Sequence, residues 1–235
     1  MQLKNAVALV TGANRGLGQN FVNALLAAGV KKVYAAARDP STVRLDGVEK
    51  IKLDVTRPED VAAAAKACGD VSLLINNAGI ARGSSFLAAG SIEAARAELE
   101  TNYIGPLALS QAFAPVLAAN GGGAIVNVLS VLSWLNLSSA ATYSASKAAA
   151  WSLTNGLRNE LRAQGTKVLG LHVGFMDTDM TKDFDVPKSD PADVVRQVLE
   201  AIVAGREEVL ADEVSRQVKQ GLSAEPASYF SDGSH

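Results

Sequence analysis

The alternation of short apolar runs with longer helical patterns constrains the fold more than any other feature of the sequence. Segments of strand length, most of them mainly apolar, recur at residues 6–12, 31–37, 49–54, 72–79, 121–130, 166–174 and 207–212. Such runs are typical of strands buried on both faces, and strands that alternate with helices pair in parallel through right-handed crossovers. We therefore expect an α/β fold: a single doubly wound, Rossmann-like domain with a parallel sheet of about seven strands and helices on both faces.

Helical patterns fill the intervals between these runs. Residues 16–28 predict the first helix, directly after the first strand, and residues 141–163 predict a long helix. A second long helical region spans residues 91–119 and contains Pro106 and Pro115. Because proline cannot donate the helical hydrogen bond, we expect a kink or a local break in that region.

Length and composition fit one globular domain. The chain has 235 residues, of which 48% are hydrophobic and 20% are charged. We expect a single dinucleotide-binding and catalytic domain over residues 1–221, followed by a C-terminal tail over residues 222–235, which lacks apolar periodicity. The formal net charge of -2 gives no global basic excess. We therefore expect neither nucleic acid nor a membrane as a partner.

The same sequence bears on compartment and redox state. It has no stretch of about eighteen uninterrupted apolar residues and no signal-peptide pattern, so we expect a cytoplasmic protein. Cys68 is the single cysteine. No intrachain disulfide can form, and we expect Cys68 to be a small buried helix residue rather than a nucleophile.

A glycine-rich loop directly follows the first strand. Gly12, Gly16 and Gly18 stand in TGANRGLG with the spacing G-x-x-x-G-x-G. Glycines let the backbone turn tightly and approach a phosphate, and the following helix presents free N–H groups to it. The loop alone is also consistent with a turn packed against a helix. Its place between a first strand and a first helix favours a dinucleotide site.

Four segments, in order along the chain, carry a resemblance to a known family. They are the loop TGANRGLG, the NNAG that ends at Gly79, the pair Asn102 and Gly105, and the set Ser130, Tyr143 and Lys147. Together they resemble the motifs of the short-chain dehydrogenases/reductases, over about residues 7–180. The resemblance implies an oxidoreductase that moves hydride between a nicotinamide and a carbonyl or alcohol carbon.

The resemblance also implies a set of cofactor contacts. Asp54 is expected to accept from the adenine amino group, and residues 77–79 to pass close to the adenosine ribose. Gly174 and Thr178 are expected to contact the nicotinamide amide and the pyrophosphate. The full predicted set is Gly12, Asn14, Arg15, Gly16, Leu17, Gly18, Arg38, Asp54, Val55, Asn77, Ala78, Gly79, Tyr143, Lys147, Val173, Gly174 and Thr178.

The end of the second strand indicates NADP(H) rather than NAD(H). An NAD-selective site usually has an acid there, but this position falls near Ala36. Arg38 follows, and Arg15 precedes the second glycine of the loop; two guanidinium groups suit a 2′-phosphate. Asp39 is the contrary residue, because a shifted loop could bring it to a 2′-hydroxyl.

The predicted chemistry depends on Tyr143 and Lys147, which share a helix face at i and i+4. We expect the Lys147 ammonium, together with the oxidised nicotinamide, to lower the Tyr143 pKa from about 10 so that Tyr143 can transfer a proton. By resemblance, Lys147 also binds the nicotinamide ribose, Ser130 polarises the substrate oxygen, and Asn102 holds a water near Lys147. Ser133 is the alternative to Ser130, but its spacing to Tyr143 is wrong.

The sequence departs from the family pattern after the sixth strand. Val173 stands where a proline usually precedes the glycine. The segment 178–189, which forms the substrate lid in the family, is short, so we expect an open and permissive pocket. Candidate pocket residues, for which core packing is an equal alternative, are Trp134, Leu135, Leu137 and Phe175.

The C-terminal region also departs from the family. A Gly-rich V-D-G-G segment, typical of tetrameric relatives, is missing, so a tetramer is in doubt. A homodimer through the helices around residues 91–119 and 141–163 remains expected by resemblance. His172 is expected to pack at a strand end, and no histidine–carboxylate cluster indicates a metal.

These patterns predict an NADP(H)-dependent oxidoreductase for a small or medium carbonyl or secondary alcohol, such as a carbonyl reductase or alcohol dehydrogenase. The alternative from another class is an NADP(H)-binding sensor on the same fold, since a fold does not establish an activity. The set Asn102, Ser130, Tyr143 and Lys147 argues against the sensor. An epimerase or dehydratase is less favoured, because those relatives are longer.

Overall fold

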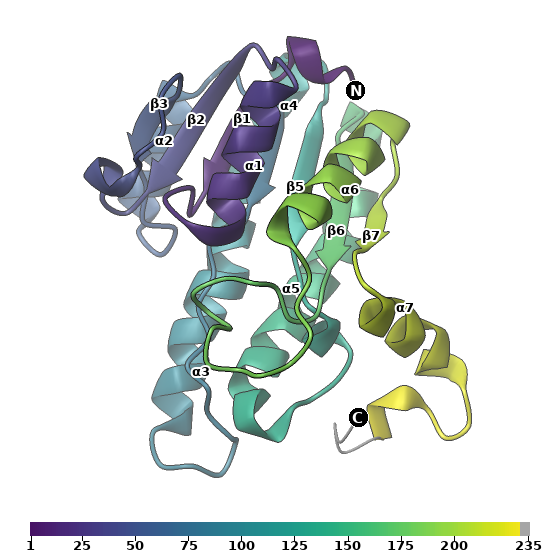
Figure 1. Ribbon diagram of the computed structural model, residues 1–235. Coiled ribbons are helices and arrows are strands. Elements are labelled where there is room, and N and C mark those ends of the chain that lie inside the picture. Colours follow the sequence, from purple (N-terminus) through teal and green to yellow (C-terminus); the bar gives the residue numbers. More distant parts are fainter. Residues whose placement is uncertain (231–235) are drawn as a thin grey trace.

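A seven-stranded sheet forms the centre of the computed structural model, which describes residues 1–230 (Figure 1). All pairings are parallel, in the order β3-β2-β1-β4-β5-β6-β7. The strands are β1 Val7–Thr11, β2 Lys32–Ala37, β3 Glu49–Lys52, β4 Leu73–Asn76, β5 Ala124–Val128, β6 Lys167–His172 and β7 Glu208–Leu210. The predicted doubly wound, parallel α/β fold is confirmed.

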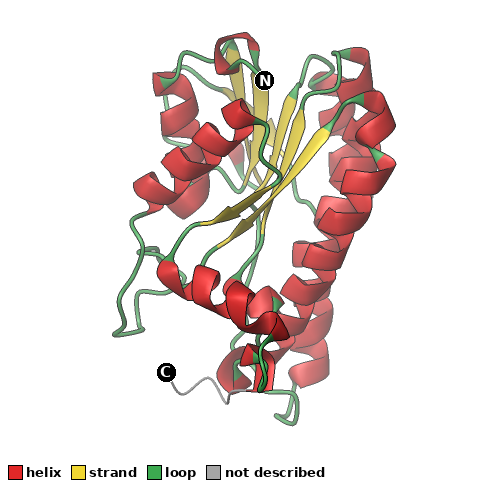
Figure 2. Ribbon diagram, turned by 90° about the vertical axis from the view of Figure 1, so that its right-hand side faces the viewer, coloured by secondary structure: helices red, strands yellow, loops and turns green. Residues whose placement is uncertain are grey.

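Helices cover both faces of the sheet, as Figure 2 shows. They are α1 Gly16–Ala27, α2 Pro58–Ala67, α3 Ser91–Leu99, α4 Gly105–Ala119, α5 Ala141–Glu160, α6 Pro191–Ala204 and α7 Glu213–Gln220. Ala8 and Val10 of β1 pack in the core beneath α1 and α6, whereas Val7 and Leu9 pack with α2, α4 and α5. This alternation follows from the two-residue period of a strand, and it explains why β1 must be apolar throughout.

The long helical region is broken where the prolines predicted a kink. Residues Glu100–Ile104 form a π-helical turn between α3 and α4, directly before Gly105 and Pro106. Pro106 has no N–H for the carbonyl of residue 102, so the regular ladder cannot continue there. Pro115, in contrast, lies inside α4 without ending it.

Two smaller predictions need refinement. Cys68 is fully buried as expected, but it follows the last residue of α2, and burial raises the pKa of its thiol to about 12. Of the predicted tail, residues 222–230 pack back on α7: Ala227 is buried, and Ser228 Oγ donates to Val218 O at 3.0 Å. Residues 231–235 lie outside the described part of the chain.

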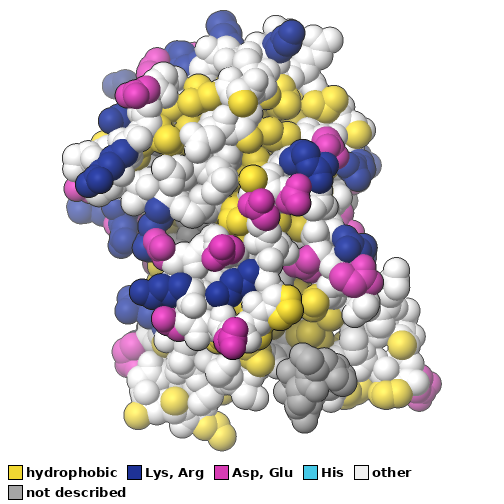
Figure 3. Space-filling view, viewed as in Figure 1, with side chains coloured by type: hydrophobic (Ala, Val, Ile, Leu, Met, Phe, Trp, Pro, Cys, Tyr) yellow, Lys and Arg dark blue, Asp and Glu magenta, His cyan; other side chains and the backbone are white. Residues whose placement is uncertain are grey.

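The surface carries charges of both signs. Figure 3 shows Lys and Arg interspersed with Asp and Glu over the visible face. Within residues 1–230, no helix has the length and apolar character that a membrane crossing requires.

Candidate active site

The candidate site lies where the loops after β1, β4, β5 and β6 meet at the carboxyl ends of the strands. The chain runs from β1 outward to β2 and β3, and then returns to place β4 on the other side of β1. Such a reversal opens a crevice at the end of a parallel sheet, which is where dinucleotides bind in doubly wound folds. All four predicted motifs fall at this end (Figure 1).

The glycine loop forms a cradle that side chains would fill. Gly12 and Gly16 have φ values of 63° and 53°, in the left-handed region that favours glycine. A Cβ on Gly18 would lie 2.2 Å from the carbonyl oxygen of Gly12. α1 then begins without a side-chain cap and without an acidic residue in its first turn. Its N–H groups therefore suit an anion, and the loop fits a dinucleotide pyrophosphate.

The NNAG segment is attached to this cradle by a residue that sequence reasoning missed. The Thr11 hydroxyl accepts from the backbone N–H groups of Asn77 at 2.9 Å and Ala78 at 3.0 Å. Asn77 Nδ2 in turn donates to Thr11 O at 2.8 Å. Asn77 therefore joins two loops, and its side chain is already engaged. The only sequence signal for this role of Thr11 was its position as a hydroxyl residue at the end of the first strand.

Two predicted cofactor residues have side chains in the core. Leu17 and Val55 are both buried. A Cβ on Gly105 would lie 2.9 Å from Val55 Cγ2, which explains the glycine at that position of α4. For Leu17 and Val55, the backbone is what remains available to a ligand. Asn14 is half-buried in the loop between β1 and α1.

The groups expected around the ribose 2′ position differ in exposure and in their hydrogen-bond partners. Ala36 is buried, while Arg38 and Arg15 are exposed. Arg15 Nη1 lies 3.3 Å from Asp179 Oδ2, an exposed ion pair that is too weak to hold Arg15 away from a phosphate. Asp39 Oδ1 accepts from both the N–H and the hydroxyl of Ser41, at 2.9 and 2.7 Å, and so caps a short turn.

Asp54 sits beside these cations. Its Oδ1 accepts from the N–H of Thr56 at 3.0 Å and from the hydroxyl at 2.7 Å. Burial raises the pKa of Asp54, but the bonds from Thr56 and the charges of Arg38 and Arg57 together hold that pKa below its ordinary value. The other carboxylate oxygen has no such bond from Thr56, so an acceptor for an adenine amino group is present.

Hydrogen bonds fix the segment after β6, which lacks the proline that is usual in the family pattern. Val173 is buried, and its carbonyl accepts from Val131 N at 3.0 Å. Gly174 N donates to Asp212 Oδ2 at 2.6 Å, and the other oxygen of Asp212 caps α7. Thr178 lies near the cradle, with Cγ2 3.7 Å from the position of a Cβ on Gly16. Asp212 was not predicted, because it is distant in sequence from this turn.

Lys147 is buried next to Tyr143. Its Nζ donates to Val128 O at 2.8 Å and lies 5.6 Å from the centroid of the Tyr143 ring. A Cβ on Gly79 would come within 3.8 Å of this Nζ, so the NNAG turn and Lys147 share one space. Burial lowers the pKa of Lys147 to about 8. The free energy needed to remove a proton from this amine near neutral pH is therefore small.

The pKa of the Tyr143 phenol is shifted upward in the protein without its cofactor. Burial is the largest influence and raises the pKa of Tyr143; the hydrogen bond with Ser130 lowers it, and the charge of Glu98 raises it further. The predicted lowering involves the oxidised nicotinamide as well as Lys147, and it stays a prediction for the protein with its cofactor bound. A raised pKa favours the neutral phenol, which is the form that can donate a proton.

Ser130 and Ser133 form one local unit. Ser130 lies two residues beyond the end of β5 and caps a turn over Val131–Ser133, with its hydroxyl accepting from Leu132 N at 3.1 Å. Ser130 is also the hydroxyl bonded to Tyr143. Ser133 Oγ instead accepts from Ser130 N at 3.3 Å. The alternative residue therefore supports the backbone of the preferred one.

Asn102 lies on the π-helical turn, and its side-chain amide is hydrogen-bonded to other residues of the protein. Its Oδ1 accepts from Ile80 N, and its Nδ2 donates to Ile80 O and to Ser146 Oγ, all at 2.9 Å. Both amide hydrogens are therefore used, and a water beside Lys147 would have to bind an oxygen of Asn102. Ser146 was not predicted; it also donates to Tyr143 O.

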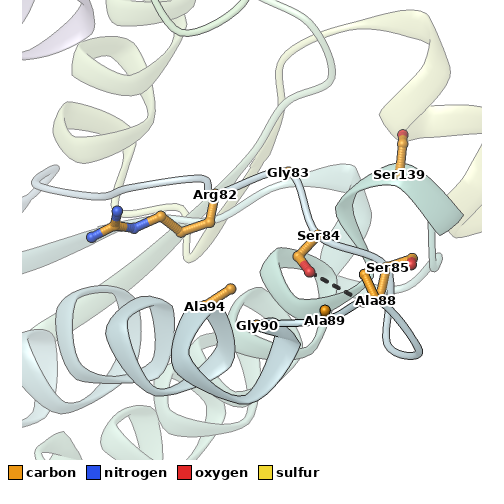
Figure 4. A pocket seen from close by; sticks show the side chains of 9 residues that line it. All are labelled: Arg82, Gly83, Ser84, Ser85, Ala88, Ala89, Gly90, Ala94 and Ser139. Atoms are coloured by element: carbon orange, nitrogen blue, oxygen red, sulfur yellow. Dashed lines mark hydrogen bonds between the residues drawn. The ribbon is translucent and has the colours of Figure 1, made fainter.

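Trp134, Leu135, Leu137 and Phe175 are absent from the lining of the cavity in Figure 4, and their role as pocket residues stays a prediction. Trp134 stacks on His172, with ring centroids 3.8 Å apart, and Phe175 packs against Phe184 of the 178–189 segment. His172 is buried at the end of β6, as predicted; burial lowers its pKa to about 4, and its Nδ1 lies 3.2 Å from Ser130 O.

An open pocket of about 520 Å³ lies instead between the loop before α3 and the turn before α5 (Figure 4). Its lining residues are Arg82, Gly83, Ser84, Ser85, Ala88, Ala89, Gly90, Ala94 and Ser139. Thr142, the neighbour of Tyr143, donates through its N–H to Ser84 O at 3.3 Å. This pocket therefore adjoins the end of α5 that carries Tyr143. Among residues 1–230, no group of three or more His, Cys, Asp or Glu could hold a metal ion.

Comparisons with known proteins agree with this geometry. Residues 6–188 match the family model described as short chain dehydrogenase. A short-chain dehydrogenase from Burkholderia cenocepacia, solved in complex with NADP, is 43% identical, with 96% of each chain covered and a TM-score of 0.92. The chain belongs to the short-chain dehydrogenase family and is an oxidoreductase of that family.

Two further relatives show the range within the family. A 3-oxoacyl-[acyl-carrier-protein] reductase from Vibrio cholerae is 33% identical over 77% of this chain and 78% of its own length. An NADPH-bound carbonyl reductase from chicken fatty liver is 30% identical over 84% of this chain and 91% of that one, with a TM-score of 0.75. Membership of the family therefore leaves the substrate open.

Proposed function

We propose that the protein is an NADP(H)-dependent oxidoreductase that interconverts a small or medium carbonyl compound and the corresponding secondary alcohol. The observation that carries this proposal is the placement of the Tyr143 phenol, which is hydrogen-bonded to Ser130 and whose ring centroid lies 5.6 Å from Lys147 Nζ, beside the glycine cradle. A proton donor, a hydroxyl for the substrate oxygen and a dinucleotide site meet at one end of the sheet.

NADP(H) is the cofactor that the surrounding residues favour. Arg15 and Arg38 are exposed at the ribose 2′ side, and Asp39 is engaged by Ser41. Planar guanidinium groups bind phosphate oxygens in pairs, whereas a 2′-hydroxyl prefers a free carboxylate. The NADP complex of the Burkholderia cenocepacia relative supports the same choice.

The protein's own part in reduction is to place and supply a proton. NADPH, when bound, supplies the hydride for the carbonyl carbon and leaves as NADP⁺. The Ser130 hydroxyl donates to the carbonyl oxygen, and Tyr143 transfers its phenolic proton to that oxygen as the C–H bond forms. Lys147, whose pKa is about 8, can return a proton to the phenolate. The same steps in reverse oxidise an alcohol.

The pocket of Figure 4 supports a short and polar substrate. Its lining combines serine hydroxyls with glycine, alanine and Arg82, whose guanidinium extends away from the other lining side chains (Figure 4). A hydrogen bond from Asp177 N to Ser189 O, at 3.0 Å, joins the two ends of the 178–189 segment. A short segment whose ends are joined covers little surface, so the proposed site discriminates weakly between carbonyl compounds.

A homodimer through the α4 and α5 region is part of the proposal. A groove of about 430 Å³ runs along these helices and is lined by Tyr103, Leu107, Ala149, Ser152, Leu153, Gly156, Leu157 and Glu160. Small residues such as Gly156, which has no neighbouring atom within 4 Å of a built Cβ, allow a second helix pair to approach closely.

Oxidation of NADPH in the presence of a panel of short aldehydes and ketones tests the proposed function. We expect absorbance at 340 nm to fall with several of them, and to fall far more slowly when NADH replaces NADPH. Tight NADPH binding without any decay across the panel would contradict the enzyme and favour an NADP(H)-binding sensor.

A further inference from the structure

His172 is a buried imidazole that contacts the turn carrying Ser130. The sequence predicted only that it packs at a strand end. Its side chain is 0% exposed at the last position of β6, and its Nδ1 lies 3.2 Å from Ser130 O. Because a carbonyl oxygen can only accept, the hydrogen of this bond belongs to Nδ1, and Nε2 of the neutral ring is then unprotonated.

The surroundings of the other ring nitrogen agree with this tautomer. Within residues 1–230, Nε2 of His172 has no hydrogen-bond partner. It lies 3.9 Å from Glu208 Oε1, which is beyond hydrogen-bond distance, and Glu208 is paired with Lys219 of α7. The contact at Nδ1 is the shorter of the two, so it decides which nitrogen carries the proton.

The ring of His172 also contacts the far end of the same turn. Ser130 caps the turn over Val131–Ser133, and Trp134 directly follows it. The rings of His172 and Trp134 are stacked, with centroids 3.8 Å apart and planes inclined by 15°. Trp134 in turn meets Trp151 of α5 edge to face, with centroids 6.2 Å apart. The turn is therefore fixed at both ends between β6 and α5.

The carbonyl of Ser130 has two donors with different effects. Ser133 N donates to it at 3.0 Å, but this bond lies within the turn and cannot fix the turn relative to the sheet. His172 donates to it from β6. Val131 N also donates to Val173 O at 3.0 Å, so two bonds attach the turn to the end of β6. One of the two comes from a side chain and can be removed by substitution.

The direction of the Ser130 hydroxyl decides whether it reaches the reacting oxygen. This hydroxyl is bonded to Tyr143 and accepts from Leu132 N at 3.1 Å. A misplacement of about 1 Å at a positioning group can cost about 100-fold in rate. Contacts that fix the Ser130 turn therefore act on the chemical step, even when they lie behind the site.

We propose that His172 is a positioning residue that acts through Ser130: its Nδ1–H holds the Ser130 carbonyl and its ring holds Trp134, which keeps the Ser130 hydroxyl directed at Tyr143 and the substrate oxygen. This inference rests on the role of Ser130 in the proposed function. It adds a residue that controls the rate of the chemical step without contributing to cofactor binding. No covalent step is involved.

The variants His172→Asn and His172→Leu form a matched pair. Both lose the ring, and their side chains have nearly the same shape, but only the Asn amide can donate to Ser130 O. We expect kcat for carbonyl reduction to fall about tenfold in His172→Leu, less than the about 100-fold of a 1 Å misplacement, and to be largely restored in His172→Asn. The NADPH Kd should match that of the wild type in both variants.

A merely structural role of His172 predicts a different pattern. The two variants would then lose kcat equally, or would lose NADPH affinity and the unfolding temperature together with kcat. Either pattern would overturn the proposal, as would a wild-type kcat in His172→Leu.

Nitrogen-15 NMR reads the tautomer directly and needs neither turnover nor a variant at His172. The chain has two histidines, so His235→Ala leaves the signals of His172 alone. Burial lowers the pKa of His172 to about 4, and the ring is therefore neutral at pH 7. We expect the proton on Nδ1. A proton on Nε2 would overturn the inference, whereas the expected tautomer in a wild-type protein without turnover would count against the proposed function instead.

Discussion

At Tyr143, burial and a hydrogen bond act on the pKa in opposite directions. Burial raises it and the Ser130 hydroxyl lowers it, while Lys147 contributes little in the protein alone. The i,i+4 spacing predicted that Lys147 shares a helix face with Tyr143. It could not predict that the phenol is removed from water. Burial is a property of the packed structure, so the direction of this pKa shift was beyond the sequence.

Arg38 gives the first prediction at this scale. Replacing Arg38 with Ala removes a guanidinium from the proposed ribose 2′ side, and a lost bond to a charged group costs about 1.5–3 kcal/mol. We expect the KM for NADPH to rise about 10–100-fold, with little change for NADH. Arg57→Ala is the control, because Arg57 is also exposed and close to Asp54 but pairs with Glu59. Equal losses for NADPH and NADH would contradict the assignment.

His172 gives a prediction about pH. Burial holds its pKa at about 4, below the ordinary 6.5, so the unfolded chain binds a proton that the folded protein does not between these values. Stability therefore falls as the pH drops from 6.5 to 4, by on the order of 3 kcal/mol from this residue. Urea unfolding should show a flatter pH dependence for His172→Asn. Equal slopes in the two proteins would exclude this contribution.

At the scale of the elements, the strands and helices were predictable because their signals are local. Continuous apolar runs marked the buried strands, and Pro106 marked the break before α4. The contacts of Asp212 with Gly174, and of Glu98 with Arg82, were not predictable. They join segments that only the folded sheet brings together, and neither has a spacing that a motif could record.

The glycine cradle yields a prediction for an element. In Gly18→Ala the new Cβ would meet the Gly12 carbonyl oxygen at 2.2 Å, so the loop or α1 must shift. We expect at least a tenfold loss of NADPH affinity and a destabilisation of about 1–3 kcal/mol, the usual cost of overpacking. Gly69→Ala is the control, since a Cβ there meets no atom within 4 Å. Unchanged NADPH binding in Gly18→Ala would argue against the cradle.

At the scale of the whole molecule, the doubly wound fold was predictable from the sequence, whereas the cavity of Figure 4 was not. The pocket of Figure 4 is lined by loop residues with small side chains, whereas the predicted aromatics pack on His172 and Phe184. Aromatic residues near a site are as often core as ligand contacts, and only packing distinguishes them.

The proposed dimer belongs to this scale. Ser152 and Asn159 are both exposed on α5, but only Ser152 lines the groove along α4 and α5. We expect Ser152→Arg to be monomeric in analytical ultracentrifugation, because a bulky charge would be buried at the interface, and Asn159→Arg to stay dimeric. A dimer that survives Ser152→Arg would place the interface elsewhere.

The account depends most on a single proton donor beside a dinucleotide site, and Tyr143→Phe examines it directly. NADPH affinity and the rate of carbonyl reduction should be measured on the same preparation of this variant and the wild type. We predict an NADPH Kd that stays within about twofold, together with a fall in reduction rate of about 10²–10⁴, the usual contribution of a general acid. Retention of the wild-type rate with NADPH bound would contradict the account.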